Sequence, residues 1–170
     1  MARYVPKDYD AVFAELDGIS DRAAILVAGS LLDHALSEAI MSRLREPPTD
    51  DDWQELFDDG GMLGTFSQKI MAAYFLKIIG PGVRRDFDLI RKIRKAAAHD
   101  MNPISFEGAD QIANRVREIQ MSNENLKKLD LRGQFLVAVR FYFANLILRA
   151  GDKNAEVAEA AKTLAPFLDR

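Results

Sequence analysis

Residues 88–100 read DLIRKIRKAAAHD, a stretch whose apolar residues recur at helical spacing. At about 100° per residue, five apolar residues of the helix that contains this stretch fall on one arc of a helical wheel. They are Val83, Phe87, Ile90, Ala97 and Ala98. Arg94 lies near the centre of that arc. A guanidinium among apolar neighbours needs a carboxylate, carbonyls or an anionic ligand to offset its desolvation. We therefore expect Arg94 to have a partner and this helix to carry the function.

Helical patterning continues along the rest of the chain, and no convincing period-two strand interrupts it. A long helix is expected from about Asp21 to Arg43, with Ser20 as its N-cap. Thr65 and Gln68 have the spacing of a capping box and predict the start of another helix. Further helices are expected at residues 51–57, 66–79, 105–119 and 154–167.

Residues 134–148 form the most apolar stretch of the chain. This stretch contains Arg140 and Asn145 and is shorter than the roughly 20 residues that a membrane span requires. Because apolar side chains occur on several of its faces, we predict a central buried helix surrounded by others. The chain has 170 residues and 48% hydrophobic content. We predict an all-α fold in which residues 1–170 form a single domain, a bundle of about seven helices.

The composition excludes several classes of protein. The net charge of -3 and a pI near 5.4 argue against a protein that coats nucleic acid through a basic surface. The absence of cysteine excludes disulfides, thiolate nucleophiles and cysteine zinc sites. His34, expected to be exposed, and His99 lack the spacing of a metal site, so we predict no metal and no cofactor. The first residues form no apolar signal segment, which predicts a cytoplasmic protein that does not bind membranes.

Charge is distributed unevenly along the chain. Residues 46–59 contain seven acidic and no basic side chains, whereas residues 84–95 contain six basic and two acidic ones. One interpretation is that these charges only solvate helix faces. The other is that the basic segment binds an acidic ligand, either RNA phosphate or an acidic protein surface. Under the second interpretation, Arg85, Arg91 and Lys95 are candidate contacts for the ligand or partner.

Two roles are open for Arg94 itself. In a structural role, its guanidinium bridges to a carboxylate at the edge of the long helix's apolar stripe, for which Asp33 is the candidate. In a functional role, the planar donor fork binds a ligand, and Asp33 belongs to the binding site.

Residues 94–99, RKAAAH, resemble the arginine–histidine signature of HEPN domains, a family of all-helical modules that includes many ribonucleases. Together with residues 21–33 and 59–67, they resemble the mannitol-operon-repressor family over about residues 20–120. The resemblance implies a HEPN-like bundle, on which we expect the C-terminal helices of residues 131–168 to pack. It also implies a regulator of transcription. Because no DNA-reading helix-turn-helix with a basic surface is evident, we expect a non-enzymatic binding protein or corepressor that acts through a protein partner, without strong intrinsic DNA binding.

The HEPN resemblance also implies an alternative, a metal-independent ribonuclease of toxin or defence type. In such an enzyme Arg94 stabilises charge on the scissile phosphate, and His99 positions or protonates an oxygen while the RNA 2′-hydroxyl attacks. Residues five apart are separated by about 140° around a helix. The two side chains therefore converge only if the helix frays or if two subunits pair across a two-fold axis, which predicts a homodimer. Lys95 stands where active enzymes commonly carry a small polar residue, and this argues against catalysis.

Overall fold

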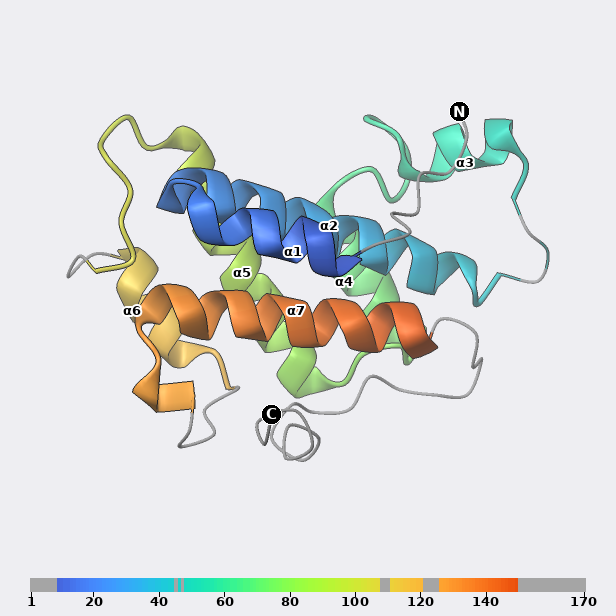
Figure 1. The fold of residues 1–170 in the computed structure, drawn as a ribbon. Helices are drawn as coiled ribbons and strands as arrows, with labels where there is room; N and C mark the ends of the chain where they lie inside the picture. The colour runs from blue at the N-terminus through green and yellow to red at the C-terminus, as the bar shows by residue number, and fades with distance from the viewer. Residues whose placement is uncertain (1–8, 45, 47, 108–110, 121–125, 150–170) are drawn as a thin grey trace.

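The computed structural model describes residues 9–44, 46, 48–107, 111–120 and 126–149. Within these ranges the chain forms an all-α bundle without a β-strand, as predicted (Figure 1). The elements follow in the order α1 (Tyr9–Glu15), η1 (Leu16–Gly18), α2 (Asp21–Met41), α3 (Asp50–Phe57), α4 (Phe66–Phe75), α5 (Pro81–His99), α6 (Gln111–Glu118), η2 (Leu126–Lys128) and α7 (Leu131–Arg149), where η denotes a 3-10 helix. The helix expected at residues 154–167 lies outside the described residues.

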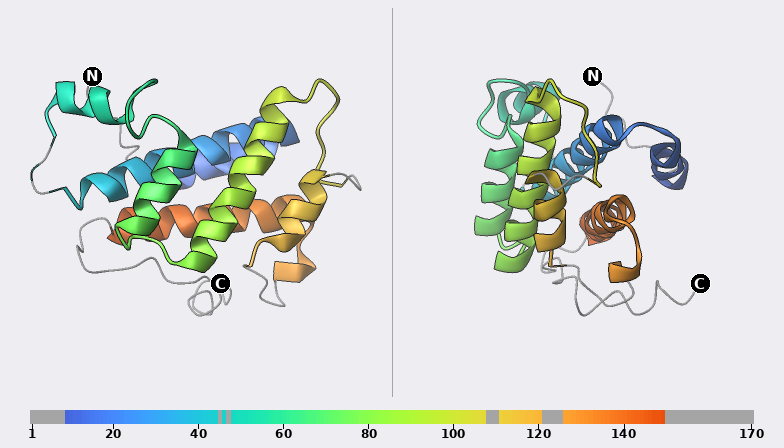
Figure 2. Two further views of the ribbon diagram at one scale, coloured as in Figure 1. Left: turned by 180° about the vertical axis from the view of Figure 1, so that it is seen from behind. Right: turned by 90° about the vertical axis from the view of Figure 1, so that its left-hand side faces the viewer.

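Helix α2 is the centre of the bundle. Figure 2 shows α4 and α5 side by side in one layer, with α2 and α7 next to each other in a second layer behind them, and α2 contacts all three of these helices. Small buried residues, among them Ala28, Gly29 and Ala35, let neighbouring helices approach α2 closely. The prediction that residues 134–148 form the central helix is therefore wrong. Helix α7 packs against α2 but leaves Arg140 and Leu148 exposed.

Two helices have the length and hydropathy of membrane-spanning segments, namely α2 and the Leu131–Leu148 part of α7. In α2, 61% of the apolar window is buried inside the bundle, compared with 39% in α7. Helix α2 uses its apolar surface to contact helices on several sides, and a helix in that position is apolar nearly all round.

Local sequence signals set several of the helix ends. The Ser20 hydroxyl accepts a hydrogen bond from a backbone N–H of the first turn of α2 and caps that helix. Thr65 and Gln68 form the predicted capping box of α4. Thr49 and Asp52 form a second capping box at the start of α3. These reciprocal bonds satisfy backbone N–H groups that a helix leaves without partners at its start.

The boundary between α4 and α5 differs from the expected one. Helix α4 ends at Phe75 rather than near residue 79 because Lys77 adopts a left-handed conformation, with φ 56°. The Ile78 N–H then donates to the Ala73 carbonyl at 2.9 Å, which is the long-range bond of a Schellman motif. Helix α5 begins directly at Pro81, since proline fits the first position of a helix. This connection places α4 and α5 antiparallel.

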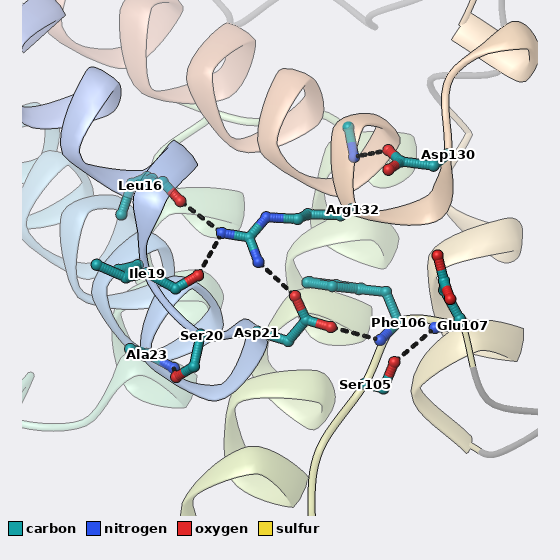
Figure 3. Close-up of polar contacts among 11 residues, drawn as sticks. Leu16, Ile19, Ser20, Asp21, Ala23, Ser105, Phe106, Glu107, Asp130 and Arg132 are labelled. Carbon is teal, nitrogen blue, oxygen red and sulfur yellow. Dashed lines mark hydrogen bonds and ion pairs between the residues drawn. The ribbon is translucent and has the colours of Figure 1, made fainter.

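A polar network joins the start of α2 to the start of α7 (Figure 3). Arg132 forms an ion pair with Asp21 and also donates to the carbonyls of Leu16 at 2.6 Å and Ile19 at 2.7 Å. The other Asp21 oxygen accepts a hydrogen bond from Phe106 N at 3.0 Å. Hydrogen bonds to charged groups are stronger than neutral ones. The network therefore fixes η1, α2, α7 and the segment before α6 relative to one another.

Candidate functional site

Arg94 lies at the edge of the buried stripe of α5 and not at its centre. The buried residues of α5 are Val83, Asp86, Phe87, Leu89, Ile90, Ile93 and Ala97. When these residues are placed at about 100° per residue around the helix, the centre of the buried stripe lies roughly 60° from Arg94, because Leu89 and Ile93 widen the stripe on its far side. The Arg94 side chain is accordingly 32% exposed. Ala98, which the sequence pattern places on the apolar arc, is exposed.

Arg94 shares one carboxylate with a second cation. Arg94 Nη1 lies 3.7 Å from Asp33 Oδ2, and Lys69 Nζ lies 2.9 Å from Asp33 Oδ1. The Lys69 side chain is only 8% exposed, and its ammonium lies 5.9 Å from the ring centre of Phe57. Asp33 is thus next to Arg94, as the structural role predicts, but its closer contact is with Lys69. We call Asp33, Lys69 and Arg94 the Asp33 cluster.

Sequence reasoning missed Lys69, although a signal was present. The buried residues of α4 are Phe66, Lys69, Ile70 and Ala73, which have the i, i+3, i+4, i+7 spacing of one helix face. A lysine inside such a face needs a carboxylate partner for the same reason as Arg94 does. The pattern of α4 could therefore have identified Lys69 as a competitor of Arg94 for Asp33.

The aliphatic stem of Arg94 packs against α2 at Gly29. A Cβ atom at position 29 would lie 2.6 Å from Arg94 Cδ and 3.2 Å from Arg94 Cγ, so a larger residue would displace this side chain. Beyond the stem, Arg94 Cζ lies 6.0 Å from the ring centre of Phe66. The guanidinium makes no hydrogen bond with any of the described residues. Its donor fork is therefore held by its stem and open to an anionic group.

His99 is the last residue of α5 and is exposed. Because α5 stays regular through His99, the imidazole remains about 140° around the helix axis from Arg94. Among the described residues, the His99 side chain has no hydrogen bond or ion pair. A single chain therefore does not bring Arg94 and His99 together.

Arg22 of α2 holds the end of α5 in place. Its guanidinium donates to the carbonyls of Ala97 at 2.5 Å, Asp100 at 2.8 Å and Asn102 at 2.6 Å. The last carbonyls of a helix have no intrahelical partner and carry partial negative charge, so a cation is favourable there. Hydrogen bonds from Asn102 lower the pKa of the Asp100 carboxyl in the same turn. Sequence reasoning missed Arg22, because no local pattern connects it to α5.

The remaining candidate residues lie along the solvent side of α5. Arg85 and Lys95 are exposed and have no ion pair among the described residues. Arg91 Nε lies 3.3 Å from Asp88 Oδ1. A shallow hollow near the start of α5 includes in its lining Tyr74, Arg84, Arg85, Asp88, Lys92 and Glu118. Arg85 belongs to that hollow, whereas Arg91 and Lys95 are within one turn of Arg94.

Away from α5's solvent side, the bundle encloses the Asp86 side chain and partly covers that of His34. Asp86 is 1% exposed and accepts hydrogen bonds from Tyr142 Oη at 2.5 Å and Gln120 N at 3.1 Å. Burial is the main cause that raises the pKa of Asp86. His34 is half-buried rather than exposed, and its Nε2 has no partner among the described residues. The prediction that His34 is exposed is therefore wrong: helices α4, α5 and α7 pack against several sides of α2, so few of its positions stay fully open to solvent.

No family model, curated protein or solved structure matches this chain. The resemblance to the mannitol-operon-repressor and HEPN families therefore stays a prediction that rests on residues 21–33, 59–67 and 94–99.

Proposed function

We propose that this protein is a cytoplasmic regulatory binding protein, of mannitol-repressor type, that acts through an acidic segment of a protein partner. The observation that carries the proposal is the Arg94 guanidinium, which is 32% exposed and held by a packed stem, yet makes no hydrogen bond among the described residues. A preorganised arginine fork suits a partner carboxylate, which it can bind through two parallel hydrogen bonds.

The neighbours of Arg94 support the same proposal. Arg91 and Lys95 lie within one turn of it on the solvent side of α5, and Lys95 is exposed. Lys69 takes the closer contact with Asp33, at 2.9 Å against 3.7 Å for Arg94. An incoming carboxylate can therefore bind Arg94 while Asp33 remains neutralised by Lys69. Such charge complementarity contributes more to specificity and association rate than to affinity.

The geometry supports a binding role better than a catalytic one. Arg94 and His99 project about 140° apart from a regular helix, and Arg22 prevents the end of α5 from fraying toward Arg94. Proton transfer requires the histidine within hydrogen-bond reach of the reacting oxygen while the arginine binds the same phosphate. Lys95, at the position where active enzymes of the HEPN type commonly carry a small polar residue, offers only hydrogen-bond donors and no acceptor.

Site-specific cross-linking tests the proposal. A photo-reactive amino acid at position 95 should give a discrete cross-linked protein in the native cells, and the yield should fall when Arg94→Ala is added. The same amino acid at position 127, an exposed lysine on η2, is the matched control and should give no such product. Equal products from both positions, or no protein product from position 95, would contradict the proposal.

The second candidate function is a metal-independent ribonuclease, favoured by one observation. The open Arg94 fork suits a phosphate as well as a carboxylate. This function requires a second chain to bring a histidine to the arginine, since one chain separates them. Cross-linking of RNA rather than protein at position 95 would favour it.

A further inference from the structure

Helix α4 exposes apolar side chains on its outer face. Met71 is 48% exposed, Phe75 is 71% exposed and Leu76, which follows the helix, is 44% exposed. Met71 and Phe75 are one turn apart and therefore project from the same side of α4. Single exposed apolar residues are ordinary, but a contiguous group of them marks an interaction surface. We call these three residues the α4 strip.

Basic side chains lie beyond the Met71 end of this strip, on the neighbouring helix α5. Because α4 and α5 are antiparallel, the last turns of α5 lie beside the first turn of α4. The distance of 6.0 Å between Arg94 Cζ and the ring centre of Phe66 reflects this arrangement. The cations of these turns, Arg91, Arg94 and Lys95, are called the basic group.

The basic group has an excess of positive charge. Arg91 pairs with Asp88, at 3.3 Å, and Arg94 shares its distant carboxylate with a second cation. Lys95 is exposed and forms no ion pair among the described residues. A ligand that neutralises this end of the surface must therefore carry negative charge.

The acidic helix α3 lies on the other side of α4. Lys69 contacts α3, with its Nζ 5.9 Å from the ring centre of Phe57. Tyr74 instead contacts α5, with its ring centre 4.5 Å from Arg84 Cζ. Positions 69 and 74 are about 140° apart around a helix, and Figure 2 shows α3 and α5 on different sides of α4. Glu118 belongs to α6, across α5 from α4, and lines the hollow at the start of α5.

We infer that the α4 strip and the basic group together bind an amphipathic helix of a partner protein, with apolar side chains at one end and acidic ones at the other. Apolar side chains one turn apart would pack on Met71 and Phe75, as in other helix-binding surfaces. Acidic side chains one or two turns further along would reach Arg94 and Lys95. A nucleic acid would satisfy only the basic group. The inference rests on the proposed function and adds apolar anchors to the acidic segment proposed there.

Selection from a peptide library tests the inference on the full chain. Short helical peptides displayed on phage would carry Leu or Ser at two positions one turn apart near one end, and Glu or Lys at two positions near the other. In the bound fraction, Leu should be enriched over Ser by about tenfold, since burying one leucine contributes at least that factor. Glu should be enriched over Lys by a similar factor of about tenfold, because Lys would face the basic group.

Charge reversal on α5 should change which peptides are selected. Arg91→Glu with Lys95→Glu should reverse the choice between Glu and Lys, which a loss of folding would not do. Arg117→Glu with Lys127→Glu, two exposed positions on α6 and η2, is the matched control and should leave the choice unchanged. Circular dichroism would establish that every variant is folded.

The apolar part has its own pair of variants. Phe75→Ser should abolish the choice between Leu and Ser, whereas Leu148→Ser on α7, another exposed apolar residue, should not. Selection of Glu without selection of Leu, or a preference for Leu that survives Phe75→Ser, would overturn the inference and leave the proposed function standing. Absence of any preference for Glu would contradict both. A wild-type dimer that Phe75→Ser dissociates in analytical ultracentrifugation would assign the strip to a second copy of this chain and also overturn the inference.

Discussion

Replacing Asp33 with alanine would remove the shared carboxylate of the Asp33 cluster and leave two cations facing each other. The more important of the two is Lys69, whose side chain is 8% exposed and whose ammonium lies 2.9 Å from Asp33. Removing one partner of a buried ion pair costs about 3 to 5 kcal/mol. Because the Asp33 side chain is itself 21% exposed, we expect a value of about 3 kcal/mol, at the lower end of that range.

Arg94→Ala should have a much smaller effect on stability. Its ion pair is long, at 3.7 Å, and its side chain is 32% exposed, so the pair contributes no more than about 1 kcal/mol. Some packing of the stem is also lost. The expected total is about 1 kcal/mol, since Asp33 keeps Lys69 as its partner.

Urea unfolding followed by circular dichroism would measure both values, with equal m-values as the check that the same transition is compared. Lys69→Met is the control, because it replaces the buried cation with an apolar chain of similar length. In that background, Asp33→Ala should cost only about 1 kcal/mol. A larger loss for Arg94→Ala than for Asp33→Ala would refute the assignment of Lys69 as the principal partner of Asp33.

Substitutions at Gly29, Lys77 and Asp86 test three further features of the structure. Gly29→Ala should leave the stability of the wild type nearly unchanged, because the close approach of Arg94 opposes the gain of about 1 kcal/mol in helix propensity. In the Arg94→Ala background, the same substitution should stabilise the protein by about 1 kcal/mol. Thermal unfolding of the wild type, both single variants and the double variant measures this coupling. Lys77→Gly should raise the free energy of unfolding by about 1 kcal/mol in urea, since glycine adopts the left-handed conformation without strain. For Asp86, burial raises the pKa in the folded state above the ordinary 3.8, so its contribution is full below pH 3.8 and is lost as the pH rises through the folded-state pKa. Urea titrations at a series of pH values from below 3.8 upward measure the unfolding free energies of the wild type and of Asp86→Asn. As the pH rises, the stability of the wild type relative to Asp86→Asn should decrease. An increase with pH would contradict the burial argument.

The sequence predicted helix ends well where the residues that fix the end lie within a few positions of it. Ser20, Thr65 and Gln68 satisfy backbone groups within three residues of themselves, so their spacing alone indicates where α2 and α4 begin. The end of α4 was less predictable, because Lys77 adopts a conformation that usually selects glycine. A lysine at that position carries no visible signal for a helix end.

The candidate site was predictable only as far as its signals are local in the sequence. The position of Arg94 beside apolar residues predicted a partner of some kind for its guanidinium, and Asp33, the candidate in the structural role, lies 3.7 Å from it. How closely Asp33 contacts Arg94 depends on Lys69 of α4, which binds the same carboxylate. The anchoring of α5 likewise depends on Arg22, which lies far away in the sequence. Such long-range pairings follow from packing and not from periodicity.

In the function proposed above, this protein binds a partner and does not cleave RNA. The most direct test is incubation of the purified full chain with a mixed pool of single-stranded RNA in EDTA, alongside Arg94→Ala and His99→Ala, with circular dichroism to show that all three are folded. We expect intact RNA with all three proteins. Cleavage by the wild type that is lost in both variants would contradict it and establish the ribonuclease.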